Sequence, residues 1–280
     1  MLVIIKGAGD LASGVALRLR HAGFDIAMTE IERPLAVRRT ICFSQAVYEG
    51  SCRVEDLTAL LVKDETGMRD CFFRGRIAVF VDPGASIVDR FSPDVLVDAI
   101  MAKRNTGTSL RAAPVVIALG PGFTAGIDCH AVIETMRGHT LGRVITAGSA
   151  LPNTGVPGDI GGHTIERLLR SPAEGVFEGR ARIGDTVRSG DTVASVNGIP
   201  IRAEIDGVLR GLLPSGLLVS KGMKAGDIDP RCEVSHCFTV SDKALSIAGG
   251  VLEAILRFRS CAGSGYDRIP ACVAEFQPHF

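Results

Sequence analysis

A glycine loop near the amino terminus carries the clearest chemical signature in the sequence. Gly7, Gly9 and Ala12 fit the pattern G-x-G-x-x-G/A, and they follow an apolar run and precede an amphipathic helical pattern. In such a loop the glycines allow a tight turn and close approach of the backbone to a pyrophosphate. Glu30 follows about 20 residues later, where an acidic side chain can bind ribose hydroxyls. These four residues are therefore predicted to bind a dinucleotide-like cofactor.

Asp10 is an awkward member of this loop. Its carboxylate lies at the expected amino terminus of a helix, where it competes with a phosphate for the positive end of the dipole. Two interpretations stay open: Asp10 belongs to the cofactor site, or it only caps the helix.

Arginines follow Glu30 closely in the chain. Arg33, Arg38 and Arg39 lie where guanidinium groups can pair with a phosphate or with a pterin-type anion. The alternative is a solvent-exposed arginine-rich turn. This alternative is slightly favoured for any single arginine, but it is less favoured for the adjacent pair Arg38 and Arg39. We include that pair in the predicted site.

A second glycine loop is expected to complete the same pocket. It contains Gly120, Pro121 and Gly122. Asp128 and His130 come next, in what reads as the start of a helical pattern, and they are candidates for general acid–base work. Capping by Asp128 with an exposed His130 explains the same pattern, so no catalytic residue is assigned.

Apolar runs predict the fold class, an α/β protein with a Rossmann-like doubly wound parallel sheet. The loops after the strands should converge on one crevice. Between residues 33 and 75 we expect an extra strand near Ile41 and a helix over 54–61. The six strands are expected at residues 2–6, 24–29, 77–81, 95–97, 115–119 and 143–146.

An internal repeat marks the carboxyl-terminal part. Six glycines and valines, at 175, 176, 179, 184, 187 and 190, recur thirty-two positions later. Two such copies resemble the biotinyl/lipoyl-like hammerhead, a small β barrel-sandwich. Carriers in that family present a modified lysine, and this sequence has no lysine between Lys103 and Lys221. We interpret the module as a rigid wall or adaptor.

Changes in composition predict the domain boundaries. A Rossmann-like nucleotide-binding domain is expected over residues 1–170 and the barrel-sandwich over 175–230. A helix over 241–258 should return to the first domain, and 259–280 read as a tail of low order.

Composition excludes several function classes. The 31 basic and 31 acidic residues leave no basic excess for nucleic acid or for an anionic membrane. No apolar stretch is long enough to span a bilayer and no signal peptide is evident, so a cytoplasmic protein is expected. The eight cysteines form no C-x-x-C pair, and we expect no metal site.

Several long segments resemble the YqeB family of the selenium-dependent molybdenum hydroxylase system. They include IIKGAGDLASG, RPLAVRRTICFSQAVYEG, VVIALGPGFTAGIDCHAVIETMRGH, LPNTGVPG and SDKALSIAGGVLEAIL. The resemblance implies an accessory role in the maturation of such a hydroxylase, with that hydroxylase as client and with no catalytic residues to transfer.

The glycine loop and the resemblance together predict a nucleotide-binding protein. The suspected cofactors are NAD(P) and a molybdopterin dinucleotide, between which the sequence does not decide. Two alternatives are an NAD(P)-dependent oxidoreductase of a small substrate and a non-catalytic chaperone that docks on an apo-hydroxylase.

Overall fold

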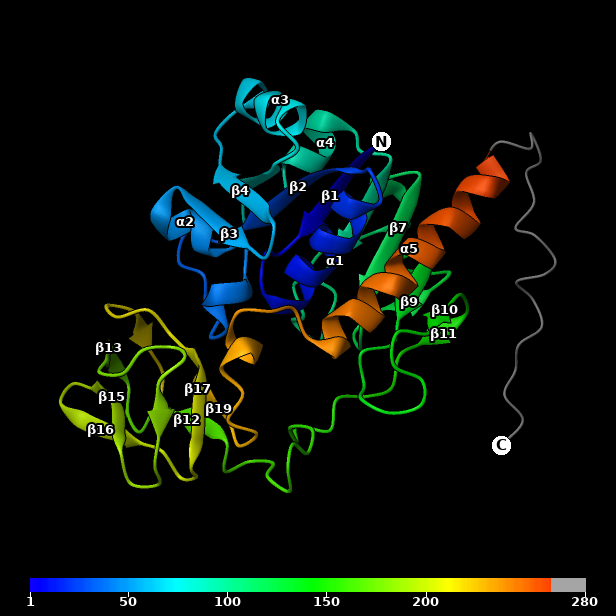
Figure 1. Cartoon of the computed structure of the whole chain (residues 1–280). Coiled ribbons are helices and arrows are strands. Elements are labelled where there is room, and N and C mark those ends of the chain that lie inside the picture. The colour runs from blue at the N-terminus through cyan, green and yellow to red at the C-terminus, as the bar shows by residue number, and fades with distance from the viewer. Residues whose placement is uncertain (263–280) are drawn as a thin grey trace.

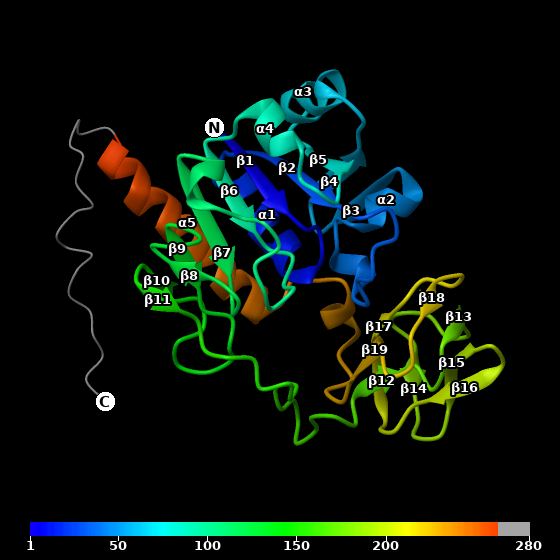
Figure 2. The ribbon, with the colours of Figure 1, turned by 180° about the vertical axis from the view of Figure 1, so that it is seen from behind.

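The structure, a computed structural model, describes residues 1–262, and of residues 260–262 only the backbone. A large sheet with flanking helices occupies the amino-terminal part, and a small β module lies near the carboxyl ends of its parallel strands (Figure 1). Two connecting segments, residues 150–167 and 230–241, join the module to the rest of the chain (Figure 2).

The large sheet has nine strands and is mixed. Its seven central strands are parallel, and the outermost strand at each edge is antiparallel to its neighbour. In spatial order the strands are β10 (Val144–Ile145), β9 (Ala131–Ile133), β7 (Val115–Leu119), β6 (Val95–Asp98), β1 (Leu2–Lys6), β2 (Asp25–Glu30), β5 (Ile77–Val81), β4 (Leu57–Leu61) and β3 (Ser51–Val54).

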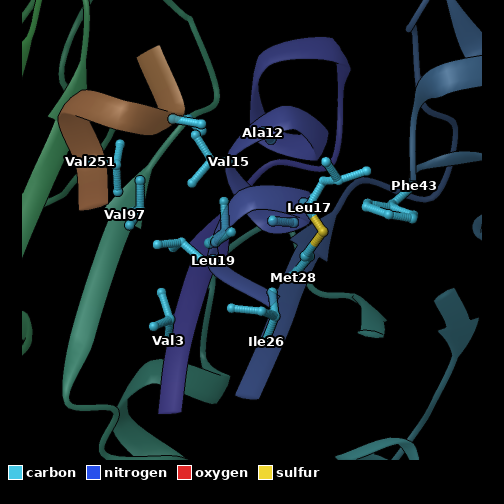
Figure 3. Close-up of a cluster of buried hydrophobic side chains, with 14 of the residues drawn as sticks. Val3, Ala12, Val15, Leu17, Leu19, Ile26, Met28, Phe43, Val97 and Val251 are labelled. Atoms are coloured by element: carbon cyan, nitrogen blue, oxygen red, sulfur yellow. The ribbon is translucent and has the colours of Figure 1, made fainter. Parts of the chain in front are cut away.

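Helices cover both faces of this sheet, which explains why its central strands are continuous apolar runs. The two longest helices pack on one face, where Figure 3 shows Leu19 near Val3 and Ile26, and Val15 near Val97 and Val251. The helices are α1 (Asp10–His21), α2 (Gln45–Glu49), α3 (Glu65–Phe73), α4 (Ile87–Phe91) and α5 (Asp242–Ala262), with 3-10 turns η1 (Arg39–Ile41), η2 (Leu110–Ala112) and η3 (Val234–Cys237).

Small residues let α1 and α5 approach each other closely. A Cβ added at Gly14 of α1 would lie 2.7 Å from the Cβ of Ala244 in α5. Val15 and Val251 are fully buried in the same cluster. The packing of α5 on α1 therefore returns the chain from the module to the large sheet.

The repeat-bearing stretch folds into two four-stranded antiparallel sheets around a core of its own. One sheet has the order β12 (Leu168–Arg170), β19 (Lys224–Asp229), β17 (Gly207–Leu212), β14 (Thr186–Val187). The other has the order β16 (Ile199–Arg202), β15 (Thr192–Val196), β13 (Gly175–Gly179), β18 (Leu218–Val219). A further two-stranded sheet, β11 (Gly148–Ser149) with β8 (Thr124–Ala125), flanks the large one.

These sheets correct the fold class expected from the sequence. The prediction of a Rossmann-like doubly wound parallel sheet with a hammerhead module was wrong. The large sheet has nine strands instead of six, and it is mixed instead of parallel. Residues 144–145, expected as a parallel strand, form an antiparallel edge.

Two local predictions were also wrong. Residues 54–61 form most of a β hairpin instead of a helix, because Glu55 adopts a left-handed φ of 53° and reverses the chain, and Ile41 lies in a 3-10 turn. The pattern after Asp128 is strand β9 instead of a helix, because it adds in parallel to the edge of β7.

The domain boundaries predicted from composition stay predictions. The last helix ends at Ala262, past the expected residue 258, and residues 263–280 of the predicted tail lie outside the described residues. Within residues 1–262, no helix combines the length and the apolarity that crossing a membrane requires.

Two adjacent glycines of α5 offer a matched test of its packing. A Cβ at Gly250 would overlap the carbonyl oxygen of Gly142, whereas a Cβ at Gly249 meets only an arginine nitrogen 3.9 Å away. We expect Gly250→Ala to lower the free energy of unfolding by about 2 kcal/mol through overpacking. Gly249→Ala should raise it by up to about 1 kcal/mol through helix propensity. Urea unfolding measures both, and equal effects of the two changes would contradict the close approach.

Candidate functional site

A crevice lies between the carboxyl ends of the parallel strands and the small module. Loops after β1, β2, β5, β6 and β7 line it from one side, and β17, β19 and Arg167, which precedes β12, line it from the other. From β1 the chain first adds strands on one side, beginning with β2, and later adds strands on the other side, beginning with β6. Ligands of open α/β sheets bind at the point where the strand order reverses in this way.

The crevice has two lobes that share Asp10, Leu11, Arg38, Met101, Arg167 and Arg210. The sheet lobe, of about 590 Å³, adjoins the glycine loop and Glu30. The connector lobe, of about 690 Å³, adjoins Lys103, residues 151–160 and the start of α5. Each lobe has the volume of a metabolite-binding site.

The glycine loop closes tightly over the ends of β1 and β6. Gly7 has a φ of 92°, and a Cβ there would lie 3.1 Å from the carbonyl oxygen of Ala99, so both the conformation and the space favour glycine. The amide of Gly7 donates to the carbonyl of Thr29 over 2.9 Å. Gly9 is the N-cap of α1 and has open space beside it. Backbone is therefore exposed to the sheet lobe at Gly9.

Glu30 accepts hydrogen bonds from the loop instead of projecting freely. Its carboxylate accepts from the amide of Ala8 over 3.0 Å and from the amide of Ile31 over 2.8 Å. Burial raises the pKa of Glu30, and the two backbone donors oppose that rise only in part. Glu30 thus fixes the loop to the end of β2 and also lines the sheet lobe.

Arg38 connects three segments at the junction of the lobes. Its Nη1 donates to Asp10 over 2.8 Å, and its Nη2 donates to the carbonyls of His236 and Thr239. The Arg38 side chain is 7% exposed. Asp10, the first residue of α1, is therefore neutralised by a buried cation. The negative charge that opposes anion binding at this helix terminus is compensated by the fold.

The module contributes a buried ionic network. Arg167 and Arg210 both bind Asp227, at 2.7 and 2.6 Å, and Arg210 also donates to Asp229 over 3.2 Å. Arg231 donates to Asp229 at 2.9 and 2.6 Å. Because Lys224 also lies 3.8 Å from Asp227, cations outnumber carboxylates in the network.

Asp229 shows how strongly this network holds its charges. Burial alone would raise the pKa of the carboxyl group, but hydrogen bonds from Arg231 and the charges of Arg210 and Arg231 outweigh it and lower the pKa to about 2. Burial lowers the pKa of Lys224, in spite of the opposing charge of Asp227.

Three buried polar atoms at the crevice have no hydrogen-bond partner among residues 1–262. They are Nε of Arg38, Nε of Arg167 and Oδ1 of Asp10. The two arginine side chains are 7% and 8% exposed, and all three residues line both lobes. Unpaired buried polar atoms cost free energy, so atoms of this kind are normally paired in the functional state.

The structure separates the residues predicted from the sequence. Five of them, Gly7, Gly9, Asp10, Glu30 and Arg38, line the sheet lobe. Pro121 lines the connector lobe. The loops after β1, β5, β6 and β7 meet at the crevice as expected, but the loop over 147–149 does not line it.

Four predicted residues do not line the crevice. Ala12 is buried inside α1, and Arg39 donates to the carbonyl of Leu212 outside the two lobes. Gly120 packs against Thr135, and Gly122 lies against the backbone at residues 103–104, where a Cβ would come within 2.5 Å of an amide nitrogen. Gly122 therefore supports the loop that carries Lys103. The predicted cofactor role of all ten residues stays a prediction.

Asp128 and His130 both accept hydrogen bonds from backbone amides in the structure. Asp128 accepts from the amide of Thr124 over 2.7 Å, and Nδ1 of His130 accepts from the amide of Val116 over 2.9 Å. Burial lowers the pKa of His130, which suits an accepting, neutral ring. Within residues 1–262, no group of three or more His, Cys, Asp or Glu residues is arranged to hold a metal ion.

Sequence reasoning missed the module's side of the crevice, namely Arg167, Arg210, Lys224 and Asp227. A signal was present, because Asp227 and Asp229 alternate on one strand and both are buried. Two acids on the same face of a strand require cationic partners when that face is covered.

A curated relative covers most of the chain. The uncharacterized protein YqeB of Escherichia coli (strain K12) is 53% identical over 255 residues, which is 91% of this chain and 47% of the relative. This identity supports the YqeB family. The chain spans about half the length of that YqeB relative, and no protein-family model matches it.

Solved structures show a fainter likeness. An aspartoacylase family protein from Mesorhizobium loti is 15% identical, covers 81% of this chain and 84% of its own, and has a TM-score of 0.27. A succinylglutamate desuccinylase/aspartoacylase from Rhodobacter sphaeroides is 16% identical with the same coverage and a TM-score of 0.28. At these scores the likeness transfers no activity to this chain.

The comparisons correct the function expected from the sequence. The YqeB relative is uncharacterized, and the similar solved structures are named as aspartoacylases and desuccinylases. We therefore do not retain the maturation role for a selenium-dependent molybdenum hydroxylase, the NAD(P)-dependent oxidoreductase or the docking chaperone. The same correction applies to the expected Rossmann fold, to the molybdenum cofactor and to nucleotide binding. The predicted partners stay predictions.

The low pKa of Asp229 predicts a defined acid sensitivity. An unfolded aspartate titrates near pH 4, so the Asp229 carboxylate stabilises the fold above that pH and loses this contribution as pH falls toward about 2. Asp229→Asn should lower the free energy of unfolding at pH 7 by about 3 kcal/mol, because two arginines lose a buried partner. The difference from wild type should shrink between pH 4 and 2.

Unfolding by urea at several pH values measures this difference. The exposed Asp89 on α4 provides the control, since Asp89→Asn should differ little from wild type at any pH. A difference between Asp229→Asn and wild type that stays constant down to pH 2 would contradict the role of the network.

Proposed function

We propose that this chain binds a small hydroxylated organic anion in the crevice, at the junction of the two lobes. The observation that carries the proposal is the set of three buried, unpartnered polar atoms on Asp10, Arg38 and Arg167. Two of these atoms are charge-assisted donors and one is a carboxylate acceptor.

The donors define the first feature of the ligand. Nε–H of Arg38 and of Arg167 belong to guanidinium groups whose other nitrogens are already engaged with Asp10, Asp227 and carbonyl groups. These engagements fix both side chains, so little rotamer entropy is lost when an anion binds. A phosphate or carboxylate oxygen is the matching acceptor for both donors.

The acceptor defines the second feature. Oδ1 of Asp10 is buried, while Oδ2 pairs with Arg38. A ligand that carries only anionic oxygens would repel Oδ1, whereas a hydroxyl or an amine would donate to it. Sugar phosphates and hydroxy acids combine an anionic group with such a donor.

The sheet lobe can receive the uncharged part of this ligand. It presents the exposed backbone at Gly9 together with the apolar side chains of Ile31, Leu35 and Ile100, which are 40%, 46% and 39% exposed. Apolar walls with a few fixed polar groups are typical of metabolite sites.

Calorimetric titration with glucose 6-phosphate, malate and succinate tests the proposal. Malate differs from succinate by one hydroxyl, so malate should bind more tightly if Asp10 accepts from the ligand. Arg167→Met should weaken binding of glucose 6-phosphate and malate by about tenfold to a hundredfold, the value of one or two charge-assisted hydrogen bonds.

Arg180→Met provides the matched control, because Arg180 is an exposed arginine of the same module that does not line the crevice. This control should bind as wild type does. Absence of binding of all three compounds at millimolar concentration would overturn the proposal. Equal weakening by Arg167→Met and Arg180→Met would also overturn it.

A further inference from the structure

The connector lobe carries an excess of positive charge that the fold itself does not balance. Its lining includes six basic residues and a single acidic one, Asp10, which Arg38 already neutralises. The basic residues are Arg38, Lys103, Arg137, Arg167, Arg210 and Lys243.

Internal pairing accounts for four of these six cations. Arg38 pairs with Asp10, Arg167 and Arg210 pair with Asp227, and Arg137 holds the exposed Asp242 through two hydrogen bonds of 2.9 and 3.0 Å. In the part of the chain that the structure describes, no carboxylate pairs with Lys103 or Lys243.

Lys243 lies where a positive charge is disfavoured. It is the second residue of α5, so it faces the positive end of the dipole of a 21-residue helix. Burial and the neighbouring charge of Arg137 lower the pKa of Lys243. A bound anion would offset both the positive end of the helix dipole and the burial of the lysine charge beside Arg137. Neither of these two features stabilises α5.

Lys103 is held at the other side of the same lobe by a strained loop. Met101 and Lys103 have φ values of 62° and 61°, in the left-handed region that residues other than glycine rarely adopt. Gly122 packs directly behind this loop, and the side-chain amide of Asn153, with its oxygen oriented toward the ammonium group, accepts from Lys103 over 3.0 Å. Left-handed residues other than glycine cost free energy and cluster at functional sites.

We infer that the connector lobe is a second anion subsite, formed by Lys103 and Lys243, and that the ligand is a bis-anion. One anionic group binds at Arg38 and Arg167, and the other binds between the two lysines. The inference rests on the proposed function, because it adds a subsite to the same crevice. It narrows the ligand class to molecules such as bisphosphates or phosphorylated acids.

Titration calorimetry with fructose 1,6-bisphosphate and glucose 6-phosphate tests the second subsite. Wild-type protein should bind the bisphosphate at least about tenfold more tightly, the value of one additional charge-assisted contact. The double variant Lys103→Met/Lys243→Met should bind both compounds with the affinity that wild type has for glucose 6-phosphate.

The double variant Lys63→Met/Lys221→Met removes the same charge from exposed positions outside both lobes. It should keep the preference of wild type, which separates a local subsite from an effect of net charge. Thermal unfolding of both double variants confirms that each is folded before it is titrated.

Failures of the two hypotheses are distinguishable. Equal affinity of wild type for the two phosphates, or loss of the preference in the Lys63/Lys221 control, would overturn the second subsite. The proposed function would stand in that case if Arg167→Met still weakened binding of glucose 6-phosphate. Absence of any binding of glucose 6-phosphate, malate and succinate would instead overturn the proposed function itself.

Discussion

The guanidinium group of Arg38 is the contact on which the crevice depends. It binds Asp10 at the start of α1 and the carbonyls of His236 and Thr239, in the segment that returns from the module to α5. One buried cation, in the segment that follows β2, therefore holds the start of α1 and the returning segment together. The neighbouring Arg39 and Thr40 extend this attachment to Leu212 and Cys237.

This contact also explains the awkward position of Asp10. A carboxylate in the first turn of α1 stabilises the isolated helix, but it would repel an anion in the crevice. Because Arg38 neutralises it and remains buried, the carboxylate can keep one oxygen for a donor group of a ligand. The sequence offered capping and ligand binding as alternatives. Gly9 is the N-cap of α1 and no side chain caps this helix, so the capping interpretation of Asp10 was wrong.

Apolar runs located most of the large sheet, because a strand covered on both faces has to be apolar throughout. The strands over 77–81 and 115–119 lie where the sequence predicted them. The hairpin around Glu55 was missed because its turn uses a left-handed residue that is not glycine, and propensity gives no warning of that. The site was predicted only on the sheet side. Arg167, just before β12, and Arg210, in β17, reach it through tertiary contacts, which local patterns do not encode.

Of the two copies of the repeat in the module, the second contributes the charged residues that line the crevice. Its two copies are offset by thirty-two residues, so Arg210, Lys224 and Asp227 correspond to Glu178, Thr192 and Ser195. Arg210, Lys224 and Asp227 of the second copy line the crevice from β17 and β19. Glu178 is exposed, and Ser195 is buried in the module with no hydrogen-bond partner for its hydroxyl among residues 1–262. Glycines and valines recur because both copies need the same turns and the same core. The ionic network does not recur, and the position of this network beside the crevice distinguishes the second copy from the first.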